Sequence, residues 1–440
     1  MANPFLPNWE YIPDGEPRVF GDRVYIYGSH DRAGADSFCD HKLKVWSAPV
    51  NDLNNWTCHG DIFHTQPDRD HPSDTDWTDN YLYAPDAVEK DGKYYLYCYI
   101  LFSRGCVAVS DTPEGPFRLL SQYKYDVPDD LVEGGAFVDP GVLVDDDGRV
   151  YIYCGYKKSY MAELKSNMYE MVSGSHIPDI IPVSDDEKGF FEACSMRKVG
   201  NTYYLIYSPN RGCRLDYMTS SSPTGPFEYR GTIIDNGIDY PGGNDHGSIC
   251  CINGQWYIFY HRMTNATITS RRACVERIEI LPDGTIPQVE MTSLGFEQSL
   301  NPYKITPADI ACVLKGGCFI TELDPFTRVI TNIRHGNIIG YKYYDFGNDN
   351  SSQTMDYSVK VNGSGCSATI RILIDGDDDS GTEIGKCVIG ASGGVYSAVV
   401  KNVTGRHSLY FAVEHNYSGW VTDWYKERQM FEIESFVFMK

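Results

Sequence analysis

Gly148-Arg-Val-Tyr-Ile-Tyr153 is the stretch from which the fold of this 440-residue chain can be inferred. A glycine turn leads into a short strand rich in tyrosine, and this pattern occurs five times. The copies are Gly21–Tyr27, Gly92–Tyr97, Gly148–Tyr153, Gly200–Tyr207 and Gly254–Tyr260, with central tyrosines Tyr25, Tyr95, Tyr151, Tyr204 and Tyr257. Successive central tyrosines are 70, 56, 53 and 53 residues apart. Such a period, with short alternating strands, is typical of small sheets repeated around an axis, so we predict a five-bladed β-propeller.

A second motif repeats at about twice that interval. Ser110-Asp-Thr-Pro-Glu-Gly-Pro-Phe117 resembles Ser220-Ser-Ser-Pro-Thr-Gly-Pro-Phe227, which lies 110 residues further along. Proline has no amide hydrogen for a sheet ladder, so both copies predict turns between strands. The alternative is a β-sandwich in which the turns recur by coincidence.

The repeat fades after Leu300, where residues 298–311 (QSLNPYKITPADIA) contain two prolines and little periodicity. From Cys312 onward, short alternating strands separated by turn residues predict a β-sandwich of the jelly-roll type. The expected strands include 328–331, 357–361, 368–373, 397–400, 408–413 and 432–438. We therefore expect an all-β chain with a propeller over residues 1–300, a linker over 301–311 and a β-sandwich over 312–440.

The charge balance is strongly acidic and disfavours several classes of partner. Lys plus Arg number 38 and Asp plus Glu number 60, so the formal net charge is −22. Such a surface repels nucleic-acid phosphates and anionic membranes, whereas a neutral oligosaccharide meets no such repulsion. No apolar run approaches the roughly 20 residues needed to span a bilayer. We expect an oligosaccharide or polysaccharide as partner, no nucleic acid and no membrane, and the oligomeric state stays open.

The 14 cysteines are scattered along the chain without a Cys-x-x-Cys pair. Structural zinc sites usually show that spacing, so structural zinc is not expected. Buried free thiols in a reducing compartment are favoured, although the even count leaves disulfides open. Residues 1–9 show no basic stretch followed by an apolar core, so we expect a cytoplasmic protein, or a secreted one if its signal lies outside this sequence.

Three carboxylates occupy equivalent places before the tyrosine-rich strands. Asp14, Asp139 and Glu192 precede the central tyrosines of their repeats by 11, 12 and 12 residues. In a propeller the innermost strands line one channel, so this near-constant offset predicts that the three acids meet there. Hydrolysis of a glycosidic bond needs a proton donor together with a base or a nucleophile, and apolar neighbours raise the pKa of a carboxyl group. Taken singly, each acid has a turn aspartate or a salt-bridged glutamate as its alternative interpretation.

Asp86 and His246 come from the two remaining repeats, 9 and 11 residues before their central tyrosines. We interpret Asp86 as a structural residue or as a support for catalytic side chains. His246 is expected to point to the axis, where it holds a cation or water, or else to be a hydrogen-bonded core histidine.

Residues 1 to about 300 resemble glycoside hydrolase family 43, because three motifs occur in order at suitable spacing. The first is Asn3-Pro4 with Asp14 in a proline-rich turn, and the second is Val138-Asp-Pro140 before an Asp-Asp-Gly turn that ends at Gly148. The third is Phe191-Glu192 before the strand with Tyr203-Tyr-Leu205. The resemblance implies a glycosidase that inverts the anomeric centre.

The resemblance also implies roles for individual side chains. Asp14 would be the general base and Glu192 the general acid, while Asp139 would tune the pKa of the acid and orient it. The family often places calcium in the channel near a histidine, here His246, and no organic cofactor is expected. A family arginine falls on Arg271, which would bind substrate, with Arg272 as an equal-looking alternative.

Two positions depart from the family pattern. Asp14 is followed by Gly15-Glu-Pro17 where Asp-Pro is usual, which makes Glu16 a rival base. Glu192 is followed by Ala193-Cys194 where Gly-Pro is common. An inverting base and acid stand about 6.5–9.5 Å apart, so we predict that separation for Asp14 and Glu192. Apolar neighbours and Asp139 should raise the pKa of Glu192 to about 6–7.

The tail resembles carbohydrate-binding module family 6 through Ile338–Phe346, Gly405–Phe411 and Phe431–Phe436. That family often has tryptophan after a Gly-Gly turn, whereas Gly393-Gly394 is followed here by Val395-Tyr396. The role of the tail therefore has two interpretations: it binds sugar, or it is purely structural.

A tail of this type is more typical of family 43 enzymes that act on arabinoxylan side chains. It favours an α-L-arabinofuranosidase that releases terminal arabinofuranosyl units from arabinoxylan-derived oligosaccharides. A β-xylosidase, or an enzyme with both activities, is the nearest alternative, and a sugar-binding propeller without catalysis is the alternative of another class. Trp77, Tyr81 and Phe102 are aromatic candidates for the pocket wall, with ordinary core packing as the other interpretation of each.

Overall fold

The computed structural model describes residues 2–103, 105–122, 137–182, 186–377 and 380–440. Nearly all regular structure in these ranges is β-strand, and the one α-helix is the short α1 (Thr422–Lys426). The predicted all-β class is therefore confirmed. No helix in the described ranges is long and apolar enough to cross a membrane.

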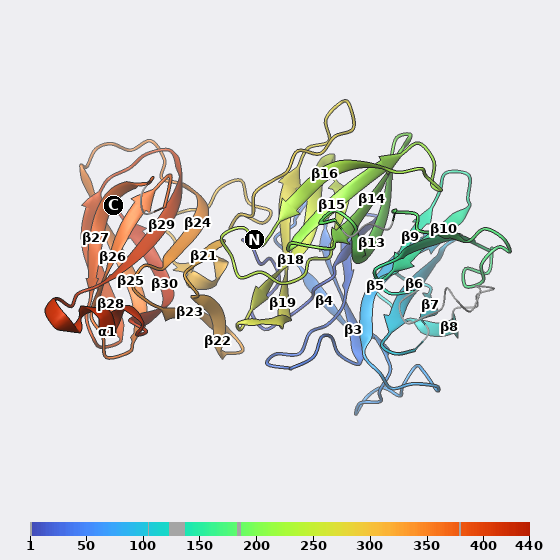
Figure 1. Cartoon of the computed structure of the whole chain (residues 1–440), viewed down its shortest axis with the longest axis horizontal. Coiled ribbons are helices and arrows are strands. Elements are labelled where there is room, and N and C mark those ends of the chain that lie inside the picture. The colour runs from blue at the N-terminus through green and yellow to red at the C-terminus, as the bar shows by residue number, and fades with distance from the viewer. Residues whose placement is uncertain (1, 104, 123–136, 183–185, 378–379) are drawn as a thin grey trace.

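The N-terminal part forms five antiparallel sheets that follow one another along the chain (Figure 1). The first sheet comprises β1 (Glu16–Phe20), β2 (Arg23–Gly28), β3 (Lys42–Pro49) and β4 (Thr57–His64). The second comprises β5 (Leu82–Lys90), β6 (Lys93–Ile100), β7 (Cys106–Ser110) and β8 (Arg118–Gln122). The third comprises β9 (Gly141–Val144), β10 (Val150–Gly155), β11 (Ser159–Leu164) and β12 (Ile177–Pro178), and the fourth β13 (Phe190–Val199), β14 (Thr202–Pro209), β15 (Arg214–Ser220) and β16 (Glu228–Asp235). The fifth has three strands, β17 (Ser248–Ile252), β18 (Gln255–Thr264) and β19 (Thr267–Ile278).

The first strands of these five sheets lie next to one another in space. β1 contacts β5, β5 contacts β9, β9 contacts β13, β13 contacts β17, and β17 returns to β1. Each tyrosine-rich segment of the sequence repeat forms the second strand of its sheet, so it packs directly outside this ring. Residues just before a first strand, although far apart in sequence, are thus brought to a common centre.

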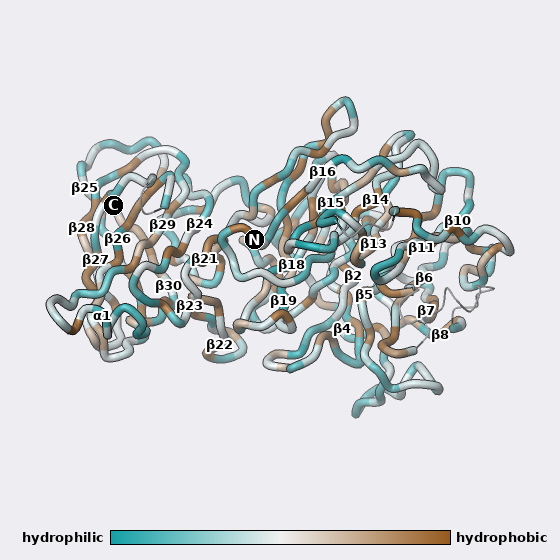
Figure 2. Tube along the Cα trace, viewed as in Figure 1, coloured by the Kyte–Doolittle hydropathy of each residue, from teal (hydrophilic) through white to brown (hydrophobic). Residues whose placement is uncertain are grey.

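The C-terminal part forms two further sheets, seen on the left of Figure 1. One has β22 (Phe319–Asp324), β23 (Thr327–Ile333), β30 (Phe431–Met439), β25 (Thr354–Gly363) and β28 (Gly394–Lys401), with β20 (Thr306–Pro307) paired to β30. The other has β21 (Val313–Lys315), β24 (Ile338–Asp345), β29 (Arg406–His415), β26 (Ala368–Ile374) and β27 (Thr382–Ile389). Tyr357 and Phe436 of the first sheet contact Phe411 of the second, so the two sheets share one aromatic core. In Figure 2 the hydrophobic colour follows many of the strands, whereas many connecting loops are hydrophilic.

The two parts meet through buried groups. Ala308, Asp309 and Ile310, which lie in the segment predicted as a linker, are buried in a short 3-10 turn. Asp309 pairs with Arg272 of β19 at 3.0 Å. One hydrophobic cluster extends from Ile258 in the fifth sheet through Ile310 into the C-terminal sheets.

All 14 cysteines are free thiols, as predicted, and only Cys58 and Cys251 are partly exposed. The sulfur atoms of Cys98 in β6 and Cys106 in β7 lie 3.5 Å apart, without a disulfide between them. The cysteines therefore act as small apolar side chains in the sheets.

Asp86 is a buried link between three sheets. Its carboxylate accepts two hydrogen bonds from Arg18 of β1, with Arg18 Nε at 2.9 Å, and one from the backbone N–H of Val142 in β9 at 2.7 Å. The side chain is fully buried, so no water replaces these partners. These contacts fit the interpretation of Asp86 as a structural residue better than that of a support for catalytic side chains.

Replacing Asp86 with alanine should therefore destabilise the protein strongly, because Arg18 would lose its carboxylate partner and keep only the carbonyl oxygen of Val142. We expect a loss of about 3–5 kcal/mol in the free energy of unfolding, measured by urea denaturation. Asp111→Ala, which removes the exposed partner of Lys93, is the matched control and should leave the midpoint unchanged. Equal midpoints for Asp86→Ala and the control would show that the buried link does not support the sheets.

Candidate active site

A cavity of about 760 Å³ lies at the common centre of the five sheets. Asp14, Asp139 and Glu192 all line it, so the structure brings together the three acids that the repeat offset predicts to meet. The remaining lining residues are Phe38, Tyr83, Tyr99, Leu101, Phe102, Val138, Tyr156, Phe191, Gly243, Asn244, His246, Ile268 and Arg271.

The backbone turns each acid toward the cavity in a similar way. Asp14 and Asp139 come two residues before β1 and β9, and both have a left-handed backbone, with φ of 56° and 54°. Glu192 lies at the start of β13, where the register with β14 is interrupted and Ala193 has φ of 67°. Such an irregularity re-aims a side chain from the sheet face to its end. The three acids thus share a local kink at the inner end of their sheets.

Two glycines allow the chain to approach these kinks closely. A Cβ atom at Gly28 would lie 2.5 Å from the carbonyl oxygen of Pro13, next to Asp14. A Cβ atom at Gly141 would lie 2.4 Å from the carbonyl oxygen of Cys194, in the irregular start of β13. Neither distance is tolerable between a carbon and an oxygen, so both positions need glycine for steric reasons.

Asp14 is held as a carboxylate by its neighbours. Its Oδ1 accepts a hydrogen bond from Arg271 at 2.7 Å and its Oδ2 accepts one from Ser29 at 2.7 Å. Burial is the largest single effect and favours the neutral form. The positive charge of Arg271, together with smaller effects of the neighbouring histidines and the Ser29 hydrogen bond, outweighs it, so the pKa of Asp14 lies below its usual value of 3.8. At neutral pH the group is therefore an ionised hydrogen-bond acceptor.

Arg271, rather than Arg272, faces the cavity. It donates to both carboxylate oxygens of Asp31, at 2.9 Å each, as well as to Asp14, and the rings and acids around it leave it buried. Arg272 is the next residue of β19, so its side chain points to the opposite face and pairs with Asp309. Arg271 thus orients Asp14, while Arg272 belongs to the junction with the C-terminal sheets.

Glu192 and Asp139 have the opposite electrostatics from Asp14. Burial raises the pKa of Glu192 from 4.5 to about 7, and the negative charge of Asp14 adds to this. Burial also raises the pKa of Asp139 well above its usual value, with the charges of Glu192 and Asp14 as the next causes. The carboxylate whose charge raises the pKa of Glu192 is therefore Asp14, whereas the sequence suggests Asp139. Asp139 also accepts a hydrogen bond from the backbone N–H of Ala193 at 3.1 Å, which positions the residue next to Glu192.

His246 lies between the acids and the rival base Glu16. Its Nδ1 is 3.7 Å from Asp139 and 3.9 Å from Asp14, and its Nε2 is 4.0 Å from Oε1 of Glu16. Burial lowers its pKa, so the imidazole is neutral. Glu16 is not among the residues that line the cavity, and its other oxygen accepts hydrogen bonds from Arg197 and Ser195.

The group around His246 fits a calcium ion only in part. Oε1 of Glu16 is buried without a hydrogen-bond partner in the described part of the chain, which makes it a free oxygen ligand beside His246. Calcium takes about six to eight oxygen ligands, so an ion held here by Glu16 and His246 would need water for most of its shell.

The three aromatic candidates for the pocket wall are separated by the structure. Phe102 lines the cavity and is 87% exposed, so it forms part of the rim. Trp77 and Tyr81 are not among the lining residues, which favours ordinary packing, the other interpretation of each. Trp77 packs against the core of the first two sheets and donates to Ser103, while the Tyr81 ring lies against His41 with centroids 4.4 Å apart.

Several residues of the site carry no signal in the sequence pattern. Asp31 and Ser29 reach Arg271 and Asp14 from the end of the first sheet, and Asn244 lies beside Glu192. The apolar wall is formed by aromatic rings that the repeat does not single out: Phe38, Tyr83, Tyr99, Tyr156 and Phe191. Of these five rings, only Phe191 belongs to a motif identified in the sequence, where it precedes Glu192.

A second aromatic surface lies on the C-terminal part. Trp420 and Trp424 are 80% and 64% exposed, and their rings meet edge to face at 5.5 Å. After the Gly393-Gly394 turn, Val395 is also exposed, and the hydroxyl of Tyr396 donates a hydrogen bond to the carbonyl oxygen of Ser392. The two rings together present an exposed aromatic surface on α1 and the turn before it.

Comparison with known proteins gives four informative similarities. The profile of the family "Glycosyl hydrolases family 43" matches residues 1–286. A protein of Thermoclostridium stercorarium named xylosidase/arabinosidase is 38% identical over 93% of this chain and 95% of its own length.

Among solved structures, a family 43 arabinoxylan arabinofuranohydrolase from Bacillus subtilis, in complex with cellotetraose, has a TM-score of 0.56 at 23% identity, over 100% of this chain and 97% of its own. A family 43 β-xylosidase/α-arabinofuranosidase from a compost microbial metagenome, with xylotriose and in calcium-free form, has a TM-score of 0.56 at 28% identity, over 66% of this chain and 98% of its own. The likeness to the first structure thus includes the C-terminal sheets.

The raised pKa of Glu192 makes a prediction about stability. A carboxyl group that keeps its proton in the folded state up to about 7, but only to 4.5 when unfolded, makes stability fall as pH rises through that window. Glu192→Gln has no proton to lose at this position, so its stability lacks this pH dependence. When the pH is raised from below 4.5 to above 7, the free energy of unfolding of the variant should therefore rise by about 3 kcal/mol relative to that of wild type. Urea denaturation across this pH range measures the difference. Glu228→Gln, an exposed glutamine substitution on β16, is the control and should show no such trend.

Proposed function

The chain belongs to glycosyl hydrolase family 43 and is therefore a glycosidase, and we propose that it releases terminal arabinofuranosyl units from arabinoxylan-derived oligosaccharides with inversion at the anomeric carbon. The observation that carries the proposal is the pairing, in one cavity, of an ionised Asp14 with a Glu192 whose pKa is raised to about 7. A base and an acid with pKa values pushed apart are what general acid–base hydrolysis requires.

We propose further that the five N-terminal sheets are the blades of a propeller. The closed series of contacts among β1, β5, β9, β13 and β17 supports this, since blades meet through their innermost strands. The facing C-terminal sheets with their shared aromatic core support a β-sandwich that begins near residue 312 and resembles a carbohydrate-binding module. The exposed Trp420 and Trp424 give this part an apolar surface on which a sugar ring can stack.

In the proposed mechanism, Asp14 accepts a proton from a water molecule that attacks the anomeric carbon. Glu192 donates its proton to the oxygen of the departing sugar, so the bond from carbon to that oxygen breaks as the bond to water forms. The substrate and the water lie between the two acids, and the separation of about 6.5–9.5 Å stays a prediction. Asp139 is a positioning residue, because it holds the backbone next to Glu192 through the N–H of Ala193.

Asp14 is a better base than Glu16 on structural grounds. Asp14 lines the cavity, while Glu16 lies behind His246 and is tied to Arg197 and Ser195. Arg271 keeps Asp14 ionised and fixes the direction in which its free lone pairs point. Arg271 lines the wall of the cavity, so a substrate contact is compatible with its place there, beside its hydrogen bonds to Asp14 and Asp31.

The choice of sugar rests on the relatives and on the tail. The Thermoclostridium stercorarium relative, similar over nearly the whole chain, is named for both xylosidase and arabinosidase activity. The Bacillus subtilis arabinofuranohydrolase shares the fold along the whole chain, tail included, which supports action on arabinoxylan side chains. β-Xylosidase, alone or beside arabinofuranosidase activity, remains the second candidate, since both substrates end in a neutral pentose. The non-catalytic alternative has no support, because the acids of the cavity are intact.

Calcium on the axis is part of the proposal. Glu16 and His246 would hold it, directly or through water, and its charge would favour the ionised form of the surrounding carboxylates.

The roles of the two acids predict different losses of activity. Glu192→Gln and Asp14→Asn should each lower kcat on an arabinoxylan oligosaccharide by about 10²–10⁴-fold, because each removes one proton transfer. On p-nitrophenyl α-L-arabinofuranoside the leaving group needs little protonation, so Glu192→Gln should lose much less while Asp14→Asn loses as much as before. Glu16→Gln keeps its hydrogen-bond acceptor and should retain most activity.

The same assays choose between the candidate sugars. Wild type should cleave p-nitrophenyl α-L-arabinofuranoside with a higher kcat/KM than p-nitrophenyl β-D-xyloside, and the reverse order would favour the β-xylosidase. Equal rates for wild type and Glu192→Gln on the oligosaccharide would exclude Glu192 as the acid, and a full loss in Glu16→Gln with activity kept in Asp14→Asn would make Glu16 the base.

The pKa shifts predict the pH profile of kcat/KM. Activity should fall above about pH 7 as Glu192 loses its proton, and should fall on the acid side only below 3.8, where Asp14 gains one. Arg271 lowers the pKa of both groups, so Arg271→Met should move both limbs to higher pH, while Arg271→Lys should restore much of the wild-type profile. If the pH profiles of kcat/KM coincide for wild type and Arg271→Met, Arg271 does not set the pKa values of Asp14 and Glu192.

A further inference from the structure

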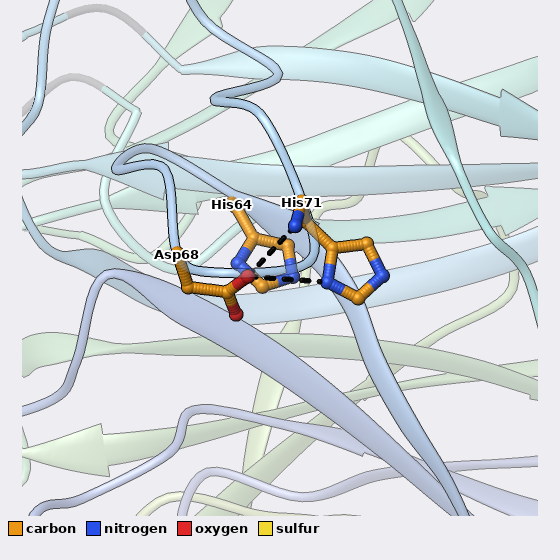
Figure 3. Close-up of side chains that lie close together, drawn as sticks. All are labelled: His64, Asp68 and His71. Carbon is orange, nitrogen blue, oxygen red and sulfur yellow. Dashed lines mark hydrogen bonds and ion pairs between the residues drawn. The ribbon is translucent and has the colours of Figure 1, made fainter.

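Two histidines and an aspartate lie together on the surface loop that follows β4, away from the central cavity. His64 is the last residue of β4, and Asp68 and His71 follow it in the connection to β5. One ligand atom from each of the three side chains lies within 4.8 Å of the other two, and no other such group occurs in the described part of the chain. Figure 3 shows the three side chains gathered at one point of the loop.

The loop holds these side chains in place without using up their ligand atoms. Asp68 accepts the backbone N–H of Asp70 and of His71, at 2.8 Å each, which leaves its second carboxylate oxygen free. The rings of His64 and His71 are stacked with centroids 4.9 Å apart and planes inclined by 20°. Nδ1 of His71 lies 3.5 Å from the Asp68 carboxylate.

His64 provides a second observation that points to a ligand at this loop. Its side chain is only 4% exposed, and its Nε2 has no hydrogen-bond partner among the described residues. A buried imidazole nitrogen without a partner is unfavourable, because it has lost water and gained nothing in return. Asp74 bonds only to the backbone of His64, at 2.8 Å, so it does not satisfy this nitrogen.

We propose that His64, Asp68 and His71 form a binding site for one divalent first-row transition metal ion, with zinc as the favoured occupant. Two imidazoles and a carboxylate are ligands that zinc accepts, whereas calcium and magnesium prefer oxygen ligands throughout. Tetrahedral zinc with bonds of about 2.0–2.1 Å places its ligand atoms about 3.3 Å apart. The observed group has to contract slightly, and Asp68 and His71 are exposed and free to do so. Water completes the shell on the exposed side.

The ion would cross-link the loop between β4 and β5, which supports the rim of the cavity. This loop leads into β5, which carries Tyr83 of the cavity wall, and Trp77 within the loop donates to Ser103, next to Phe102 on the rim. Binding only to the folded chain stabilises it by mass action, so the loaded protein should unfold at a higher temperature. The cysteine spacing gives no hint of this site, because it uses no thiol.

The test is metal binding to the full chain after treatment with a chelator. Titration of wild type with Zn²⁺ by calorimetry should show one bound ion. In His71→Ala and in Asp68→Asn, the zinc affinity should be at least about 100-fold weaker than in wild type. His407→Ala is the matched control, since His407 also pairs with an aspartate, Asp375, but belongs to no group of three ligands in the described residues. It should bind zinc as wild type does. His71 and Asp68 are exposed, so both variants should fold, and unchanged glycosidase activity would show that they have.

Cobalt substitution separates this site from the 14 thiols. The Co²⁺ complex of wild type should show d–d absorption of a nitrogen and oxygen site without a thiolate charge-transfer band, and His71→Ala should lose that absorption. Zinc binding that is equal in wild type and both variants, a thiolate band in the cobalt spectrum, or no binding at micromolar zinc would each overturn the proposal.

Discussion

Carboxylates buried at the centre of five sheets need partners, and the supply of arginines there determines what each of them does. Asp14 pairs with Arg271, Glu16 with Arg197 and Asp86 with Arg18. Each of these three buried carboxylates thus meets an opposite charge, which offsets the cost of burying it.

Glu192 and Asp139 have no arginine or lysine within salt-bridge distance in the described part of the chain. Burial therefore raises the pKa of both. The negative charge of Asp14 raises the pKa of Glu192 further, and the charges of Glu192 and Asp14 raise that of Asp139. The same scarcity of cations that makes this part of the core electrostatically unfavourable thus creates the proton donor. Stability and function are opposed at this point, as is common where a protein keeps a carboxyl group neutral near pH 7.

Geometry adds the second requirement, since an acid is useful only if it faces the cavity. The left-handed residues Asp14 and Asp139 and the irregular start of β13 at Glu192 turn the side chains from the faces of their sheets to the inner ends. Gly28 and Gly141 let neighbouring backbone come close enough to support these turns. The C-terminal sheets contribute at a distance: they bury Arg272 and Asp309 at the junction and leave the aromatic surface of Trp420 exposed.

The sequence by itself determined the repeat, the all-β class and the acids Asp14, Asp139 and Glu192, because glycine turns, tyrosine strands and a constant offset are local patterns. It did not determine that Trp77 and Tyr81 pack behind the rim, that Arg271 rather than Arg272 serves Asp14, or that Asp31 completes that pair. Asp31 and Arg271 are separated by 240 residues, and His64 gains its neighbours from a loop without a pattern. Only the tertiary structure decided these points, because which charges a buried group meets depends on how distant sheets close around it, and no local spacing records that.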